Sequence, residues 1–136
     1  MPEKIRTGFV SNSSSSSFVI VGFEYTGDVK QFRDIVFENF DVSEKDQKEI
    51  DEYVNDDDES YSAYYELCSV LEKNGIDSIR EDKILIGKKL VDMDSDDSYV
   101  PDSEHDIDKL VQTVRDIRSK LNIETPIKLY TGTEQC

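Results

Sequence analysis

Residues 18–23 read Phe-Val-Ile-Val-Gly-Phe, and the rest of the chain is expected to fold around this short apolar run. The run has no charge and is rich in residues that favour strands, so it predicts a strand buried on both faces. Thr26-Gly27-Asp28 follows it and combines residues that are typical of turns and helix caps, so we expect the strand to end before Thr26.

Four helices are expected downstream of this strand. Each follows a residue whose side chain can accept a hydrogen bond from the first turn, and these residues are Asp28, Ser43, Ser60 and Ser103. The second helix has few apolar positions, so we expect it to be exposed and acidic. Asn74-Gly75 is expected to end the third helix and Asn122 the fourth.

The remaining apolar runs predict further strands. Gly87-Lys88 separates two such runs within residues 83–93, which predicts a tight β-hairpin with Gly87 at positive φ. Residues 127–130, Ile-Lys-Leu-Tyr, predict a closing strand. The order of elements predicts an α+β or α/β fold, with a small mixed sheet of about four strands, one hairpin and about four helices. The length suits one domain over residues 1–136, with residues 1–17 as an N-terminal arm.

Acidic residues dominate the composition, with 31 Asp and Glu against 16 Lys and Arg and a formal net charge of −15. Residues 41–66 contribute −9 of this charge and residues 92–108 contribute −8, so the acidity is local. Such a surface repels nucleic acids and anionic membranes but attracts basic protein surfaces, including nucleic-acid channels. We therefore expect neither direct nucleic-acid binding nor membrane binding.

The cellular setting follows from three further features. The two cysteines, Cys68 and Cys136, do not form a disulfide framework. The first residues lack the apolar segment of a signal peptide, and no run approaches the roughly 20 apolar residues of a membrane span. These features predict a cytoplasmic protein in a reducing compartment.

Asp92, Asp94 and Asp96 alternate at the end of a predicted strand, and this spacing can converge oxygen ligands on a divalent cation. An EF-hand loop starting at Asp92 would need glycine and glutamate where the chain has Asp97 and Ser103, so that class is excluded. A metal-dependent phosphohydrolase or nucleotide-handling enzyme is one interpretation. A solvated acidic loop is the simpler one. No other cofactor is predicted.

Other catalytic patterns are weak. His105 is the single histidine and lies in an acidic segment, while Cys68 occupies the apolar face of a predicted helix. The six glycines show no phosphate-binding spacing. Tyr61, Tyr64 and Tyr65 could stack on bases, but no basic groove accompanies them, so packing in a core or an interface is favoured.

The serine tract at residues 13–17 lies between the N-terminal ten residues and the first strand. Residues 6–18 read Arg-Thr-Gly-Phe-Val-Ser-Asn-Ser-Ser-Ser-Ser-Ser-Phe, and this segment resembles the opening of a group of small proteins encoded by tailed bacteriophages and some bacteria. Residues 128–136 are similar to the C-termini of that group. The resemblance implies an origin rather than an activity.

The tract has two interpretations. It can continue the strand as an extended segment, or it can serve as a peptide that a partner recognises. We predict that the chain is an acidic phage-type accessory protein that binds a host or phage protein with a basic surface; a virion component is a further interpretation. The residues expected to make a specific contact through the arm are Arg6, Gly8, Phe9, Ser11, Asn12, Ser13, Ser14, Ser15, Ser16 and Ser17.

Overall fold

The computed structural model describes residues 15–94 and 106–135. Its elements form one antiparallel sheet and four α-helices, which confirms the α+β class. In chain order they are β1 (Ser15–Tyr25), α1 (Val29–Asn39), α2 (Glu44–Val54), the short 3-10 helix η1 (Asp57–Glu59), α3 (Ser60–Lys73), β2 (Asp77–Arg80), β3 (Ile84–Asp94), α4 (Ile107–Leu121) and β4 (Lys128–Gln135).

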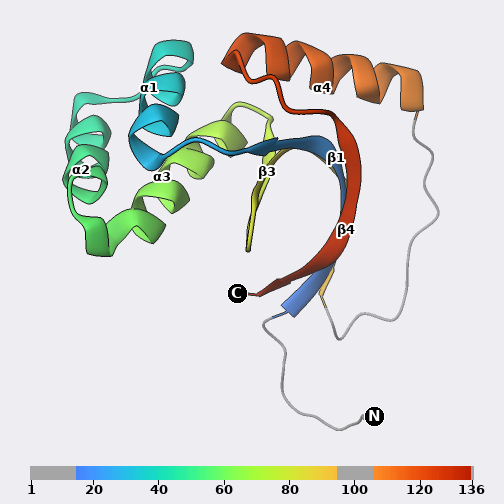
Figure 1. Ribbon diagram of the computed structural model, residues 1–136, viewed down its shortest axis with the longest axis horizontal. Coiled ribbons are helices and arrows are strands. Elements are labelled where there is room, and N and C mark those ends of the chain that lie inside the picture. The colour runs from blue at the N-terminus through green and yellow to red at the C-terminus, as the bar shows by residue number, and fades with distance from the viewer. Residues whose placement is uncertain (1–14, 95–105, 136) are drawn as a thin grey trace, which may run out of the picture.

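The four strands form one sheet in the order β2-β3-β1-β4, and every neighbouring pair is antiparallel. The sheet is therefore not mixed. β1 lies in its interior between β3 and β4, as expected of the most apolar run in the sequence. Figure 1 shows that β1 and β4 curve together, while α1, α2 and α3 gather at one end and α4 crosses the top.

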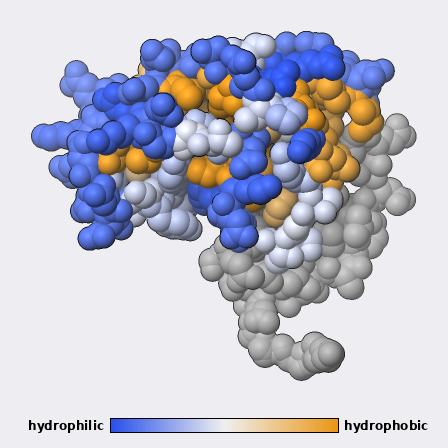
Figure 2. All heavy atoms as spheres, viewed as in Figure 1, coloured by the Kyte–Doolittle hydropathy of each residue, from blue (hydrophilic) through white to orange (hydrophobic). Residues whose placement is uncertain are grey.

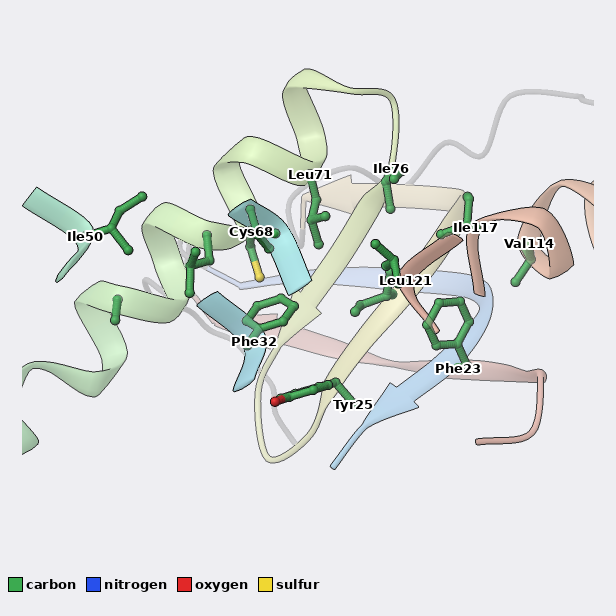
Figure 3. Close-up of a cluster of buried hydrophobic side chains, with 14 of the residues drawn as sticks. Phe23, Tyr25, Phe32, Ile50, Cys68, Leu71, Ile76, Val114, Ile117 and Leu121 are labelled. Carbon is green, nitrogen blue, oxygen red and sulfur yellow. The ribbon is translucent and has the colours of Figure 1, made fainter. Parts of the chain in front are cut away.

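β1 is buried on both faces, as its sequence predicts. Its alternate residues Val21, Phe23 and Tyr25 face the helices and form the main core with residues such as Phe32 and Leu121 (Figure 3). The opposite face carries a smaller cluster made of Phe18, Ile20, Ile79 and Leu85, against which Tyr130 packs. Both clusters contain residues of β1, so this strand contributes to the hydrophobic core on both faces of the sheet.

The predicted hairpin at Gly87-Lys88 is wrong. Both residues lie inside β3, and among the described glycines only Gly75 has a positive φ. Gly87 instead lies directly opposite Gly22 in the β1–β3 ladder, where a side chain on either residue would collide with the other strand. The actual hairpin joins β2 to β3 through residues 81–83, where the Glu81 N–H donates to the carbonyl of Lys83 at 3.2 Å.

Two of the four predicted helix starts are confirmed. Asp28 caps α1 through a reciprocal capping box with Gln31, and the Ser43 hydroxyl accepts from the N–H of Asp46 at the start of α2. Ser60 is the first residue of α3 rather than its cap, because η1 leads directly into that helix.

The predicted start of α4 is also displaced. Its N-cap is Asp106, whose carboxylate accepts from the N–H of Lys109, whereas Ser103 lies outside the described residues. The predicted end is confirmed, because Asn122 adopts the left-handed conformation with φ 57°. β4 is longer than the four-residue strand expected from the sequence, since it continues to Gln135. Within the described part of the chain, no helix is long and apolar enough to cross a membrane.

Candidate functional site

The end of the serine tract belongs to the sheet. Ser15, Ser16 and Ser17 are the first residues of β1, so the strand begins inside the segment that was expected to be an arm. Ser16 lies opposite Asp94 in β3 and opposite Glu134 in β4. The extended interpretation is therefore confirmed for these three serines. The other residues expected to make contacts through the arm lie outside the described residues, and they are Arg6, Gly8, Phe9, Ser11, Asn12, Ser13 and Ser14.

The structure also places part of the predicted metal-binding segment. Asp92 and Asp94 form the end of β3, where they lie opposite Phe18 and Ser16 of β1. Asp96 and His105 fall outside the described residues. The sheet thus brings the end of the serine tract and the start of the acidic segment side by side. The described residues contain no group of three or more His, Cys, Asp or Glu placed to hold a metal ion, so the cation site stays a prediction.

Cys68 is a core residue, as its place on an apolar helix face indicates. Its side chain is fully buried in the main core, between α3 and the sheet (Figure 3). Burial raises the pKa of the Cys68 thiol, and it outweighs the opposing effect of Ser78 and Arg80 nearby. A protonated, inaccessible thiol is a poor nucleophile.

We therefore expect the Cys68 thiol to resist alkylation in the folded protein. In a Cys136→Ser variant, which leaves Cys68 as the only thiol, iodoacetamide at pH 8 should modify the protein only after a denaturant is added. The measurement is the mass increase with time under native and denaturing conditions. Rapid modification of the native variant would show that the thiol is accessible and would contradict the core assignment.

Among the described residues, exposed negative charge gathers most on α2, η1 and the residues that flank them, which we call the acidic surface. Its members are exposed carboxylates that make no ion pair with another described residue, namely Asp41, Glu44, Asp46, Glu49, Glu52, Asp56, Asp57 and Asp58. Lys45 and Lys48 are the exposed cations beside them. Figure 2 shows mostly hydrophilic residues over α1 and α2. Eight of the eleven acidic residues in the −9 segment are therefore exposed on this surface.

Arg33 fixes the position of this surface relative to α1. Its guanidinium donates to both carboxylate oxygens of Asp51 in α2, with Nε–Oδ1 at 2.7 Å and Nη2–Oδ2 at 3.2 Å, and to Asp34 at 2.8 Å. Hydrogen bonds to these two carboxylates raise the pKa of Arg33. On an adjacent face of α2, Ile50 and Val54 are buried in the core. The exposed carboxylates are thus presented on a helix that is held at two points.

Acidic side chains from different elements converge around Tyr53. Glu49 is the largest influence that raises the pKa of the Tyr53 phenol, and Glu59, Glu66 and Glu52 contribute further. Glu59 and Glu66 belong to η1 and α3, so the negative field at this point depends on how α2 packs against α3. The folded chain therefore concentrates negative charge beyond what α2 alone would give.

α3 carries two exposed tyrosines. Tyr61 is 70% exposed and Tyr65 is 48% exposed, and the Arg80 guanidinium lies 4.8 Å from the centre of the Tyr65 ring. Tyr64 points inward instead and packs against Phe32 with ring centres 5.6 Å apart. The sequence prediction that the tyrosines serve packing is confirmed for Tyr64, whereas Tyr61 and Tyr65 remain available at the surface.

A separate groove of about 830 Å³ lies between α1 and the end of α4. Its walls carry Asp34, Glu38, Glu124 and Lys120, together with side-chain amides such as that of Asn39. The charges have both signs and do not converge on one point in the described residues, so the groove defines no reaction. Sequence spacing gives no sign of this groove, because its walls come from segments 80 or more residues apart.

Comparison with known proteins adds no assignment: no protein-family model, no curated protein and no solved structure matches this chain.

Proposed function

We propose that this protein acts by binding another protein, with the acidic surface docked on a basic surface of the partner. The observation that carries the proposal is the set of exposed carboxylates on α2 and η1 that make no ion pair with another described residue. Carboxylates that form no ion pair in their own fold remain available to attract an external cation. Because α2 is packed against the core, the backbone that carries them loses little conformational freedom when a partner docks.

The exposed tyrosines favour a protein as the partner. Tyrosine is enriched at protein interfaces because it offers a large rigid contact area and a hydroxyl that can form hydrogen bonds. Tyr61 and Tyr65 supply such contacts on α3, the helix that directly follows η1. A nucleic acid or an anionic membrane would be repelled by the same field.

The N-terminal resemblance indicates where the partner is to be sought. Residues 6–18 resemble the opening of phage-encoded proteins, so a host or phage protein with a basic channel or groove is the proposed partner. Acidic helices that occupy such a channel would compete with the nucleic acid that normally binds there. The function proposed for the chain is therefore that of a non-catalytic accessory protein that modulates a basic partner.

Neutralising the acidic surface should weaken this binding strongly. In the variant Glu49→Gln/Glu52→Gln/Asp57→Asn/Asp58→Asn, we expect the association rate with the partner to fall about 10- to 100-fold at low salt, because electrostatic steering is lost. The partner is isolated by capture on the immobilised wild-type chain from an extract of phage-infected bacteria. It is then purified, and its binding kinetics are measured by surface plasmon resonance at several salt concentrations.

A matched control changes the same number of charges elsewhere. The variant Glu72→Gln/Asp108→Asn/Asp116→Asn/Glu124→Gln also removes four carboxylates, all exposed and outside the acidic surface. It should keep most of the association rate. If both variants bind equally well, or if no protein is retained at low salt, the proposal is wrong.

A further inference from the structure

β4 forms an edge of the sheet along its whole length (Figure 1). Its eight residues pair with β1 in one unbroken register from Lys128 to Gln135, without a bulge. No strand within the described ranges pairs with its other side. An edge of this kind leaves a row of backbone N–H and C=O groups open to another strand.

Within the described residues, β4 lacks the usual protection of an edge strand. Proteins commonly block such edges with proline, with bulges or with several charged side chains. Pro126 precedes the strand, but β4 itself contains no proline, and Lys128 and Glu134 are its only charged residues. The opposite edge of the sheet, β2, is only four residues long and has a charged residue at each end, Asp77 and Arg80. β4 is therefore the edge that is suited to pairing.

We propose that a second copy of this chain pairs with β4 in antiparallel fashion, so that the two sheets join across a two-fold axis at Thr131. The charges of β4 favour this register, because Lys128 and Glu134 are equally distant from Thr131. Each Lys128 then lies opposite Glu134 of the second copy, and the pair occurs twice. Opposite charges at directly opposed positions stabilise an antiparallel pair.

The same register matches the other residues of β4. Leu129, which is 62% exposed, lies opposite Thr133 of the second copy, and Tyr130 lies opposite its Gly132. The large side chains thus meet small ones on both sides of the axis. β4 has no net charge, whereas the whole chain has a net charge of −15. Two acidic copies therefore repel each other less when they approach along β4.

The test is the mass of the full chain in solution. Sedimentation equilibrium over a range of protein concentrations, at a salt concentration that screens the net charge, should show a species of twice the 15.6 kDa chain mass. Lys128→Glu should weaken association about tenfold, because two attractive pairs become repulsive. The double variant Lys128→Glu/Glu134→Lys restores opposite charges and should restore association.

Lys30→Glu is the matched control, since it makes the same charge change at an exposed position on α1 and should leave association unchanged. Circular dichroism checks that each variant is folded, and Glu134→Lys supplies the same reversal if Lys128→Glu does not fold. A wild-type chain that stays at 15.6 kDa at every soluble concentration overturns the proposal. So does a dimer that Lys128→Glu does not weaken, or a double variant that stays as weak as the single one.

Discussion

Replacing Gly87 with alanine is expected to lower the free energy of unfolding by at least about 3 kcal/mol. A Cβ atom at this position would lie 2.0 Å from the carbonyl oxygen of Val21 and 2.6 Å from the Cα of Gly22. These atoms belong to the backbone of the central strand, so they cannot move aside without disturbing the β1–β3 ladder. Urea denaturation followed by circular dichroism measures the loss.

Gly132→Ala is the matched control within the same sheet. A Cβ atom there would meet the Phe18 ring at 3.0 and 3.1 Å, and a ring edge can shift by the few tenths of an ångström that are needed. We expect a change below about 1 kcal/mol, since alanine also lowers the entropy of the unfolded chain. Equal losses in the two variants would show that the close approach of Gly22 and Gly87 is not what requires glycine in β3.

The difference between these glycines explains why the hairpin prediction was wrong. A glycine between two apolar runs is typical of a turn, where its freedom to adopt positive φ is used. Gly87 is needed for a different reason, which is the absence of a side chain where two strands approach closely. The same sequence pattern, a glycine between two apolar runs, is compatible with either role. The actual turn, Glu81-Asp82-Lys83, contains neither glycine nor proline and gives no comparable signal.

The elements that could be predicted are those with local causes. The buried strand β1 follows from an uncharged apolar run, and the starts of α1 and α2 follow from the caps Asp28 and Ser43. The start of α4 was predicted at Ser103, whereas the structure caps this helix with Asp106, which is also a capping residue type and lies three positions later. Local patterns identify elements reliably but do not choose between neighbouring caps of equal quality.

The candidate site likewise has a part that could be predicted from the sequence and a part that could not. The acidic surface could be located from the sequence because its carboxylates follow one another along residues 41–58. The convergence of Glu59 and Glu66 on Tyr53 could not, since it depends on the packing of α3 against α2. The open edge of β4 could not be predicted either, because tertiary contacts set the order of the strands and the hydrophobic periodicity of the sequence does not reveal them.

Phe32→Ala should be the other strongly destabilising change, with an expected loss of about 4 kcal/mol. The Phe32 ring is fully buried and lies 4.8 Å from the Tyr25 ring and 5.6 Å from the Tyr64 ring, so its removal leaves a cavity between β1, α1 and α3. Figure 3 shows Phe32 and Tyr25 side by side in the core. The measurement is again the free energy of unfolding in urea.

A second readout separates this cavity from a general loss of structure. Burial raises the pKa of the Tyr25 phenol well above its ordinary value near 10. Water that enters the space left by Phe32 should lower that pKa toward the ordinary value, so phenolate absorbance should appear at a lower pH than in the wild type.

Phe37→Ala is the control on the same helix. Its ring is only half-buried and lies under the Arg33 guanidinium at 4.5 Å. We expect it to cost about 1–2 kcal/mol and to leave the Tyr25 titration unchanged, because the space that it opens is at the surface. Should Phe32→Ala prove no more destabilising than Phe37→Ala, the aromatic cluster would not be the contact that joins α1 and α3 to the sheet.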